Sequence, residues 1–439
     1  MIKLPRQFLA FLGDSFGLVP GLMVVVGILA GVAFVHIDRS GLVPRWLIES
    51  AWLYNGGGTG ARTLLGAVAS STIGVAGTVF SITIAALSLA AGQMGPRLLR
   101  NFTHDRGNQF TLGAFLGTFC YALMVLRSVR TQSEGEFVPH LSMSVGILLA
   151  FVCVGTLVYF VGHMAGRINV DTVIELVSGE VRAAIKRIGT REPQAQLPAI
   201  STWHDAAVVS DVRHGYVEHI DTDRLADWAD ARQTRVRLLV RAGDYVFPGA
   251  AIALAAPAVQ GLAEAISDAT TLKAERSSAD DLEYAVRQLV EVAVRALSPG
   301  INDPHTAMSA LDRLGAALCD LVPLTLPSGA HLRNGRCVLV VPVVRYGGLV
   351  DAMFHLIRQN AAGSAAIFIR MLDVLTAAAG CERDSARLAE LKRHASLILG
   401  DAERDVKTPA DRLNVCARHA RFVAVAVRGP AALIDSTWQ

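Results

Sequence analysis

The residues best suited to do chemistry lie in the uncharged stretch from Leu64 to Met94. Small and hydroxyl-bearing residues recur there at spacings of three and four, which places them on one face of a helix. They are Ser71, Gly74, Thr78, Ser81, Ala85, Ser88 and Gly92. In a membrane such a face either packs closely against another helix or lines a path for water and ions. Both uses remain open, and pore lining is the functional hypothesis.

Three polar side chains lie at or just after the end of this stretch that we expect on the cytoplasmic side: Gln93, Arg97 and Arg100. Arginines around the mouth of a pore would attract anions, so an anion is slightly favoured as the permeant ion. Contact with lipid head groups is the alternative explanation for the same side chains.

A second group that invites a chemical interpretation is Asn302, Asp303 and His305. Amide, carboxylate and imidazole groups together could hold a ligand or a cation. The same residues also suit a tight corner between two helices, because Asp is a good N-cap and Pro304 fits a first helical turn.

Three common catalytic or ligand-binding motifs are absent from the sequence. It has no phosphate-binding glycine loop ending in Lys and Ser or Thr, no H-E-x-x-H and no nucleophile elbow. The six cysteines are scattered without a C-x-x-C pair or a histidine at ligand spacing, as in a reducing compartment. The net charge of +3 indicates no nucleic-acid partner. We therefore expect no enzyme activity, no cofactor and no metal.

The elements that must position these residues are unevenly distributed along the 439-residue chain. Hydrophobic residues make up 52% of the total and concentrate in the first part, whereas most charges follow. The apolar runs predict a transmembrane domain over residues 1–166, with spans near 17–36, 64–94, 110–127 and 138–166. Four spans in contact with the lipid bilayer place both termini on one side. The arginines of 97–106 and the charged tail favour the cytoplasm for that side, hence a bacterial inner-membrane location.

The sequence after residue 166 predicts a cytoplasmic α+β region. Residues 167–200 form an amphipathic connecting helix that continues the fourth span, and 201–258 form a small β module. The turn at 243–249 resembles that of the barrel-sandwich hybrid fold of biotinyl and lipoyl domains. No Lys lies between Lys186 and Lys273 to carry a prosthetic group, so a structural or adaptor role is favoured. Residues 259–439 read as mainly helical.

Several phrases resemble a bacterial family of uncharacterised predicted membrane proteins, domain of unknown function 2254. The matching phrases are 79–83 (VFSIT), 96–102 (PRLLRNF), 112–119 and, most specifically, 296–304 (ALSPGINDP). The resemblance implies a multi-pass membrane protein with a cytoplasmic tail. It implies no activity and no catalytic residues.

Together these patterns favour a homo-oligomeric passive ion channel. The second span would line the pore, and the cytoplasmic domain would serve assembly or gating. No carboxylate lies within the spans, which argues against an ion-coupled pump. The alternative is a non-conducting scaffold or signalling protein that recruits a partner through its cytoplasmic domain. A membrane enzyme is the least favoured class.

Overall fold

The computed structural model describes residues 16–40, 53–94, 105–131, 137–167, 169–190, 194–276, 281–361 and 363–434, apart from the side chains at 90, 91, 93, 94 and 167. The chain divides into two compact units, Met1–Thr172 and Val173–Gln439.

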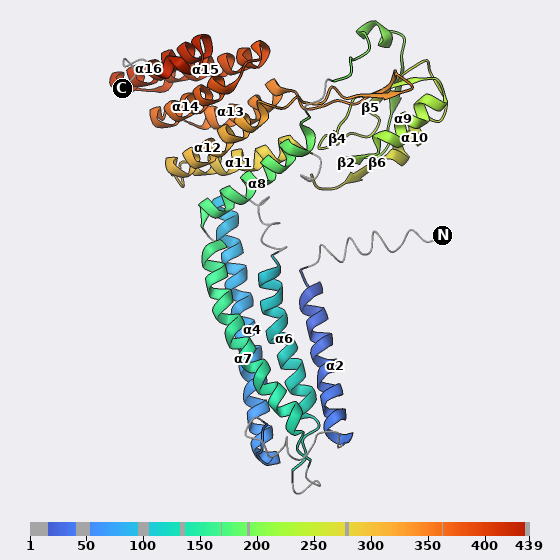
Figure 1. Ribbon diagram of the computed structural model, residues 1–439, viewed down its shortest axis with the longest axis vertical. Coiled ribbons are helices and arrows are strands. Elements are labelled where there is room, and N and C mark those ends of the chain that lie inside the picture. The colour runs from blue at the N-terminus through green and yellow to red at the C-terminus, as the bar shows by residue number, and fades with distance from the viewer. Residues whose placement is uncertain are drawn as a thin grey trace. The chain divides into compact units, whose positions relative to one another are not determined.

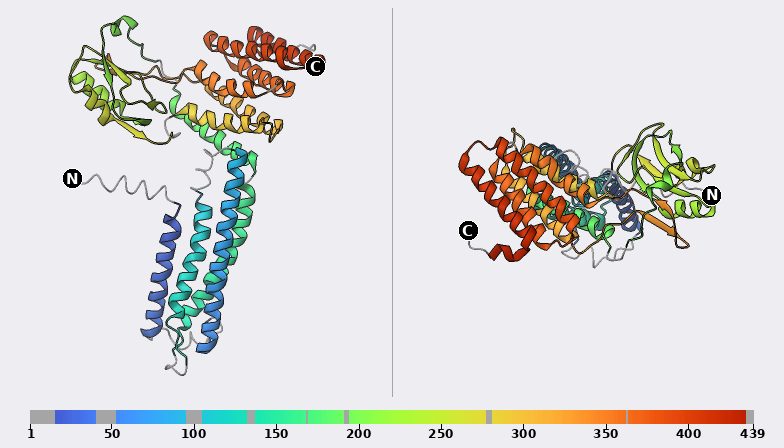
Figure 2. Two further views of the ribbon diagram at one scale, coloured as in Figure 1. Left: turned by 180° about the vertical axis from the view of Figure 1, so that it is seen from behind. Right: turned by 90° about the horizontal axis from the view of Figure 1, so that it is seen from above.

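The first unit contains four long helices that lie side by side (Figures 1 and 2). All four are long and apolar enough to cross a membrane. They are α2 (Leu18–Ser40), α4 (Gly58–Met94), α6 (Arg106–Leu126) and α7 (His140–Arg167). The expectation of about four apolar spans is confirmed.

Helix α6 is the centre of this unit, because it packs against α2, α4 and α7. Half of its apolar window is buried, against 17–22% in the other three helices. Polar contacts join the helix ends. The carboxylate of Asp38 on α2 accepts hydrogen bonds from the backbone N–H groups of Leu141 and Ser142, at 3.1 and 2.9 Å, in the first turn of α7. That turn has unpaired N–H donors, which a carboxylate satisfies well.

Glycines allow α2 and α6 to approach closely. Gly27 and Gly31 on α2, and Gly113 and Gly117 on α6, are each four residues apart and therefore share a helix face. A Cβ atom at Gly27 would collide with the carbonyl oxygen of Gly117, and one at Gly117 would lie 2.9 Å from the carbonyl oxygen of Met23. This is close small-residue packing of the kind common in membranes.

The amphipathic segment that follows does not continue the fourth span as one helix, which corrects the expectation. Helix α7 ends at Arg167, and α8 (Val170–Ile188) begins anew. The side chain of Asn169 accepts a hydrogen bond from the backbone N–H of Asp171 at 2.9 Å. A side-chain acceptor at this position supports a new helix start. The apolar side of α8, including Val177 and Val181, is buried.

The second unit begins its β structure close to the expected places. The strands are β1 (Ala207–Ser210), β2 (Gly215–Ile220), β3 (Arg235–Leu238), β4 (Tyr245–Val246), β5 (Ala251–Ala256), β6 (Thr270–Lys273), β7 (Ala330–Arg333) and β8 (Arg336–Val340). They form a five-stranded sheet in the order β1-β5-β3-β8-β7 and a three-stranded sheet in the order β4-β2-β6. Strand β8 pairs in parallel with β3, with Val236 opposite Leu339. The module therefore draws on residues well beyond 201–258.

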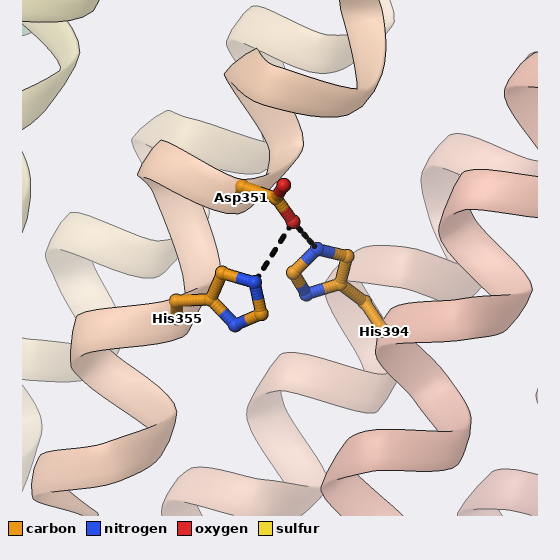
Figure 3. Close-up of side chains that lie close together, drawn as sticks. All are labelled: Asp351, His355 and His394. Atoms are coloured by element: carbon orange, nitrogen blue, oxygen red, sulfur yellow. Dashed lines mark hydrogen bonds and ion pairs between the residues drawn. The ribbon is translucent and has the colours of Figure 1, made fainter.

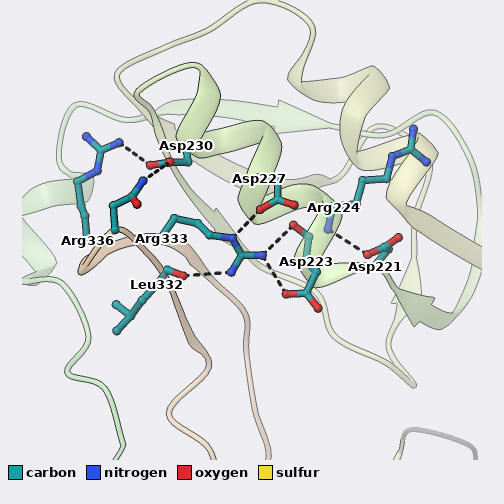
Figure 4. Close-up of polar contacts among 9 residues, drawn as sticks. Asp221, Asp223, Arg224, Asp227, Asp230, Leu332, Arg333 and Arg336 are labelled. Atoms are coloured by element: carbon teal, nitrogen blue, oxygen red, sulfur yellow. Dashed lines mark hydrogen bonds and ion pairs between the residues drawn. The ribbon is translucent and has the colours of Figure 1, made fainter.

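Ion pairs fasten the β7–β8 hairpin to helix α9 (Thr222–Ala231), about a hundred residues earlier in the chain (Figure 4). Arg333 bonds to Asp223 at 2.9 Å and to Asp227 at 2.6 Å, and Arg336 bonds to Asp230 at 3.1 Å. The acidic residues recur along α9 at intervals of three and four, so they face the hairpin together.

The core of the β module includes helix residues as well as strand residues. Leu225 and Ala226 of α9 and Leu262 and Ile266 of α10 (Leu262–Ala269) are buried in the same cluster as the strands. Helix α9 lies inside the expected β module 201–258 and was not expected, whereas α10 lies in the region 259–439 that was expected to be mainly helical. Both helices depart from the all-β barrel-sandwich resemblance. The coarser expectation, a mixed α and β region, is confirmed.

The remaining helices pack on one another in the second unit. They are α11 (Leu282–Ala296), α12 (Pro304–Leu321), α13 (Tyr346–Asn360), α14 (Ala365–Cys381), α15 (Ser385–Asp405) and α16 (Pro409–Arg428), with the short turns η3 (Ile200–Trp203) and η4 (Pro430–Ile434). Helix α13 packs against α11 and α15, and α14 against α12, α15 and α16. Buried aromatic residues such as Phe354, Phe368 and Phe422 fill the space between them.

Candidate functional site

The small-residue face of α4 is exposed along its whole length within this chain. All seven residues predicted to line a pore are exposed: Ser71, Gly74, Thr78, Ser81, Ala85, Ser88 and Gly92. Five further small residues extend the same side of the helix, namely Gly60, Thr63, Ala67, Ser70 and Gly77. We call these twelve residues the α4 outer face. A Cβ atom at Gly74, Gly77 or Gly92 would meet nothing within 4 Å.

The opposite side of α4 makes the contacts with the bundle. Its buried residues are Gly58, Ala61, Leu65, Ala69, Thr72, Ala76, Val79 and Ala86. At 100° per residue these positions centre on the side directly away from the α4 outer face. Among the described residues, the α4 outer face therefore does not pack inside the four-helix unit, a possibility that the sequence left open.

The hydroxyl groups of the α4 outer face donate to their own helix. Ser70 and Ser81 donate to the carbonyl oxygens of Gly66 and Gly77 at 2.8 and 2.9 Å. Ser71 and Thr78 donate to the carbonyl oxygens of Val68 and Gly74 at 3.1 and 3.2 Å. Because the protons of these four hydroxyl groups are used within the helix, their oxygen lone pairs are what they offer to the surroundings.

The other exposed surfaces of the bundle have a different composition. On α2, Leu22 and Leu29 are 63% and 62% exposed, and on α7, Phe151 and Val158 are 69% and 71% exposed. Bulky aliphatic and aromatic groups of this kind suit contact with lipid chains. Among its described residues, the first unit thus presents two kinds of exposed surface, of which the α4 outer face is the small and hydroxyl-bearing one.

The three residues expected at the mouth of the pore cannot be placed. Arg97 and Arg100 lie outside the described residues, and so does the side chain of Gln93, whose backbone belongs to α4.

The second sequence candidate is a helix corner between α11 and α12. Asp303 is the N-cap of α12, and its carboxylate accepts bonds from the backbone N–H of Thr306 at 3.1 Å and from its hydroxyl at 2.6 Å. Asn302 has a φ of +49°, in the left-handed region that Asn tolerates well. His305 is exposed. The predicted N-cap and first-turn proline are confirmed, and all three residues lie at the corner without forming an enclosed site.

Replacing Asp303 with Ala should lower the free energy of unfolding by about 1 kcal/mol, because the start of α12 loses its cap. The bonds from Thr306 hold the pKa of Asp303 below its ordinary value. The stabilisation by the Asp303 carboxylate is therefore fully present at pH values above its pKa in the unfolded chain, about 3.9. It is lost as the pH falls through the lower pKa of the folded protein. Thermal unfolding at pH 7 and pH 3 measures this: the difference between parent and Asp303→Ala should shrink in acid. His305→Ala is the matched control and should change little. An equal loss from both variants would contradict the capping role.

A third cluster was not identified from the sequence. Asp351 and His355 on α13 and His394 on α15 bring their polar atoms together (Figure 3). The Nε2 atoms of His355 and His394 lie 2.9 and 2.8 Å from the same carboxylate oxygen, Asp351 Oδ1. The available signal was the D-x-x-x-H spacing of Asp351 and His355, which is too common to stand alone. Their partner lies about forty residues further along the chain.

Burial and charge set the protonation of this cluster. His394 is fully buried, and this burial lowers its pKa to about 4 against the opposing hydrogen bond to Asp351, so its ring is neutral near pH 7. Burial alone would raise the pKa of Asp351. Hydrogen bonds from Arg393 and His394 outweigh it and hold that pKa below its ordinary value. The cluster therefore combines a carboxylate with a neutral imidazole.

An open cavity of about 630 Å³ lies beside the segment that joins β8 to α13. Its walls include apolar residues of 340–344 and the guanidinium of Arg387. That guanidinium already donates to the carbonyl oxygen of Leu324 at 2.7 Å and to Glu382 at 3.4 Å. The charge of Arg387 is therefore already paired within the protein, and we assign no ligand to this cavity.

Comparison with known proteins identifies similar sequences without a described activity. The family model "Predicted membrane protein (DUF2254)" matches residues 13–377. The uncharacterized protein MT1328 of Mycobacterium tuberculosis (strain CDC 1551 / Oshkosh) is 28% identical over 98% of this chain and 84% of its own length. The uncharacterized protein Mb1321c of Mycobacterium bovis (strain ATCC BAA-935 / AF2122/97) matches with the same identity and coverage. No solved structure matches the chain.

Proposed function

We propose that this chain, which belongs to the DUF2254 family of predicted membrane proteins, assembles as a homo-oligomer in a bacterial inner membrane and forms a passive ion pore. The α4 outer face would line the pore, and the second unit would serve assembly or gating on the cytoplasmic side, where both termini would lie.

One observation carries this proposal: the contrast between the α4 outer face and the bulky surfaces of α2 and α7. Lipid chains gain more from contact with Leu, Val and Phe than with Gly and Ser. A row of hydroxyl oxygens and accessible helix backbone suits weak, repeated contact with water and ions. In an assembly around an axis, bulky residues that flank the face, such as Phe80 and Ile82, would pack between copies.

The absence of charge on the α4 outer face favours passive flow. Within the described parts of the four helices and their caps, the carboxylates are Asp38 and Asp105, both at helix ends. Asp38 caps α7, and Asp105 accepts from Gly107 N–H at 3.2 Å and lies 2.6 Å from His163 Nε2. Carriers coupled to protons or sodium ions commonly use a carboxylate at membrane depth, and these two groups have structural partners instead.

The charge preference of such a pore would result from two opposing contributions. Arg97 and Arg100 at its mouth would attract anions. The hydroxyl lone pairs of the α4 outer face would favour cations, because the hydroxyl protons are donated to the helix. The measured reversal potential under a KCl gradient reports which contribution dominates.

Purified full-length protein reconstituted into liposomes tests the proposal. We expect a salt gradient to dissipate through these vesicles without added substrate, proton gradient or nucleotide, faster than through protein-free vesicles. Flux equal to that of protein-free vesicles, at a confirmed protein content, would contradict the pore.

A second candidate function is a non-conducting scaffold, which one observation favours. Tyr216, Tyr245 and Phe247 form a chain of aromatic contacts on the β module, with ring centroids 5.0 Å apart in each pair. Phe247 is 63% exposed. Exposed aromatic groups are common in protein interfaces. Loss of a co-purified partner on Phe247→Ser, with no flux in any variant, would support this function instead of the pore.

A further inference from the structure

We propose that Asp351, His355 and His394 form a binding site for one divalent transition-metal ion of the zinc type. The site lies in the second unit and does not depend on the proposed pore. Two imidazole nitrogens and one carboxylate oxygen form a ligand set suited to Zn²⁺ and its neighbours, whereas Mg²⁺ and Ca²⁺ prefer oxygen ligands.

Helix geometry brings the three groups together. Asp351 and His355 are four residues apart on α13, so their side chains share one face of that helix. His394 reaches them from α15, which packs against α13. All the candidate ligand atoms lie within 4.8 Å of one another (Figure 3). An ion there would join two helices that are distant in sequence.

The two imidazole rings are not held in one tautomer by other contacts. The Nδ1 atoms of both His355 and His394 are buried and have no hydrogen-bond partner among the described residues. In the present arrangement both Nε2 atoms can only donate to Asp351 Oδ1. Moving the proton to Nδ1 would free the Nε2 lone pairs for a metal. It would leave a buried Nδ1–H without an acceptor among the described residues, a cost that the metal bonds must exceed.

The guanidinium of Arg393 already pairs with Asp351 Oδ1, the oxygen that both imidazoles contact. Nη2 of Arg393 lies 2.5 Å from Asp351 Oδ1 and 2.9 Å from Glu390 Oε2. The Arg393 side chain is 41% exposed, so it can leave Asp351 and keep Glu390. A metal ion would therefore compete with this guanidinium for Asp351 and gain the two imidazoles that the guanidinium cannot use.

The distances from the two imidazoles to the carboxylate require only a small adjustment. Zinc bonds of about 2.0–2.2 Å in tetrahedral geometry separate ligand atoms by about 3.3 Å. The two Nε2 atoms now lie 2.9 and 2.8 Å from Oδ1, so they would retreat by about half an ångström. His355 and Asp351 are 33% and 39% exposed, which allows this movement and leaves an open position for water. His394 is fully buried, so we expect its ring to move least of the three ligands.

Metal titration of the full-length protein in detergent, after treatment with a chelator, tests the proposal. Calorimetry with Zn²⁺ should show one ion per chain, and Co²⁺ should give the visible spectrum of nitrogen and oxygen ligands without a sulfur charge-transfer band. Asp351→Asn and His394→Gln should each weaken binding by about 100-fold or more, since changes to residues behind the ligands already cost 10–100-fold. Mg²⁺ should not compete.

Arg393→Gln is the decisive matched variant. It removes the competing cation and no ligand, so it should strengthen Zn²⁺ binding, and Zn²⁺ should raise the unfolding temperature of this variant at least as much as that of the parent. This prediction stands even if Asp351→Asn fails to fold. Weaker binding in Arg393→Gln, no stoichiometric binding in the parent, or unchanged binding in a folded Asp351→Asn would each overturn the site.

Discussion

Ser81→Leu is expected to reduce ion flux through reconstituted vesicles to the level of protein-free vesicles. Ser81 lies in the middle of the α4 outer face and is exposed within the chain. A leucine there would replace a hydroxyl with a bulky apolar group, repeated once per copy around the proposed pore. Hydrophobic constrictions stop conduction by excluding water. Flux assays at matched protein content measure the effect.

The matched control for this prediction is Ile84→Leu. Ile84 is also on α4 and is 48% exposed, but it lies beside the α4 outer face and is already bulky. It should conduct like the parent. Because Ser81 is exposed and its hydroxyl bonds to its own helix, Ser81→Leu should leave the folding of the four-helix unit intact. Normal flux from a folded Ser81→Leu protein would contradict a pore lined by the α4 outer face.

Gly117→Leu is expected to have the largest effect on stability. A Cβ atom at this position would lie 2.9 Å from the carbonyl oxygen of Met23, and that backbone cannot move without separating α2 from α6. Inserting extra methylene groups into a well-packed core costs about 1–3 kcal/mol, and a clash with backbone should reach or exceed the upper end of that range. Denaturation in detergent, followed by a probe on α2, measures the loss.

Gly155→Leu provides the control for helix propensity and hydrophobicity. Gly155 lies within α7, and a Cβ atom there would meet nothing within 4 Å. This variant should be as stable as the parent or slightly more stable, because Gly is a poor helix former. Equal destabilisation of both variants would show that the α2–α6 contact is not the cause.

The sequence predicted those features that depend on neighbours in the chain. Runs of apolar residues located all four long helices, and Asp303 before Pro304 located the start of α12. Both follow from local physics, namely the length needed to cross a bilayer and the capping of a helix. The start of α8 was missed because Asn169 caps it with one short-range bond inside a continuous amphipathic pattern.

Features that depend on distant pairing could not be predicted in the same way. The periodicity of α4 identified its small-residue face, but only the position of α6 and α7 shows which side of α4 is packed. The pairing of β3 with β8 joins segments about a hundred residues apart. The cluster of Asp351 and His394 forms because α13 and α15 pack together. A sequence pattern records spacing within one element, and these contacts lie between elements.

The most direct test of the proposed pore is a cysteine scan of α4 in a lipid bilayer. Single cysteines would be introduced on the α4 outer face at Ser71, Thr78 and Ser81, and on α7 at Val158 as the lipid-facing control. The parent would be a variant that lacks the six native cysteines. We predict that charged, membrane-impermeant thiol reagents modify the three α4 positions and block flux, while the Val158 position stays unmodified. Modification of none of the α4 positions, in protein shown to be folded, would contradict a water-filled path along this face.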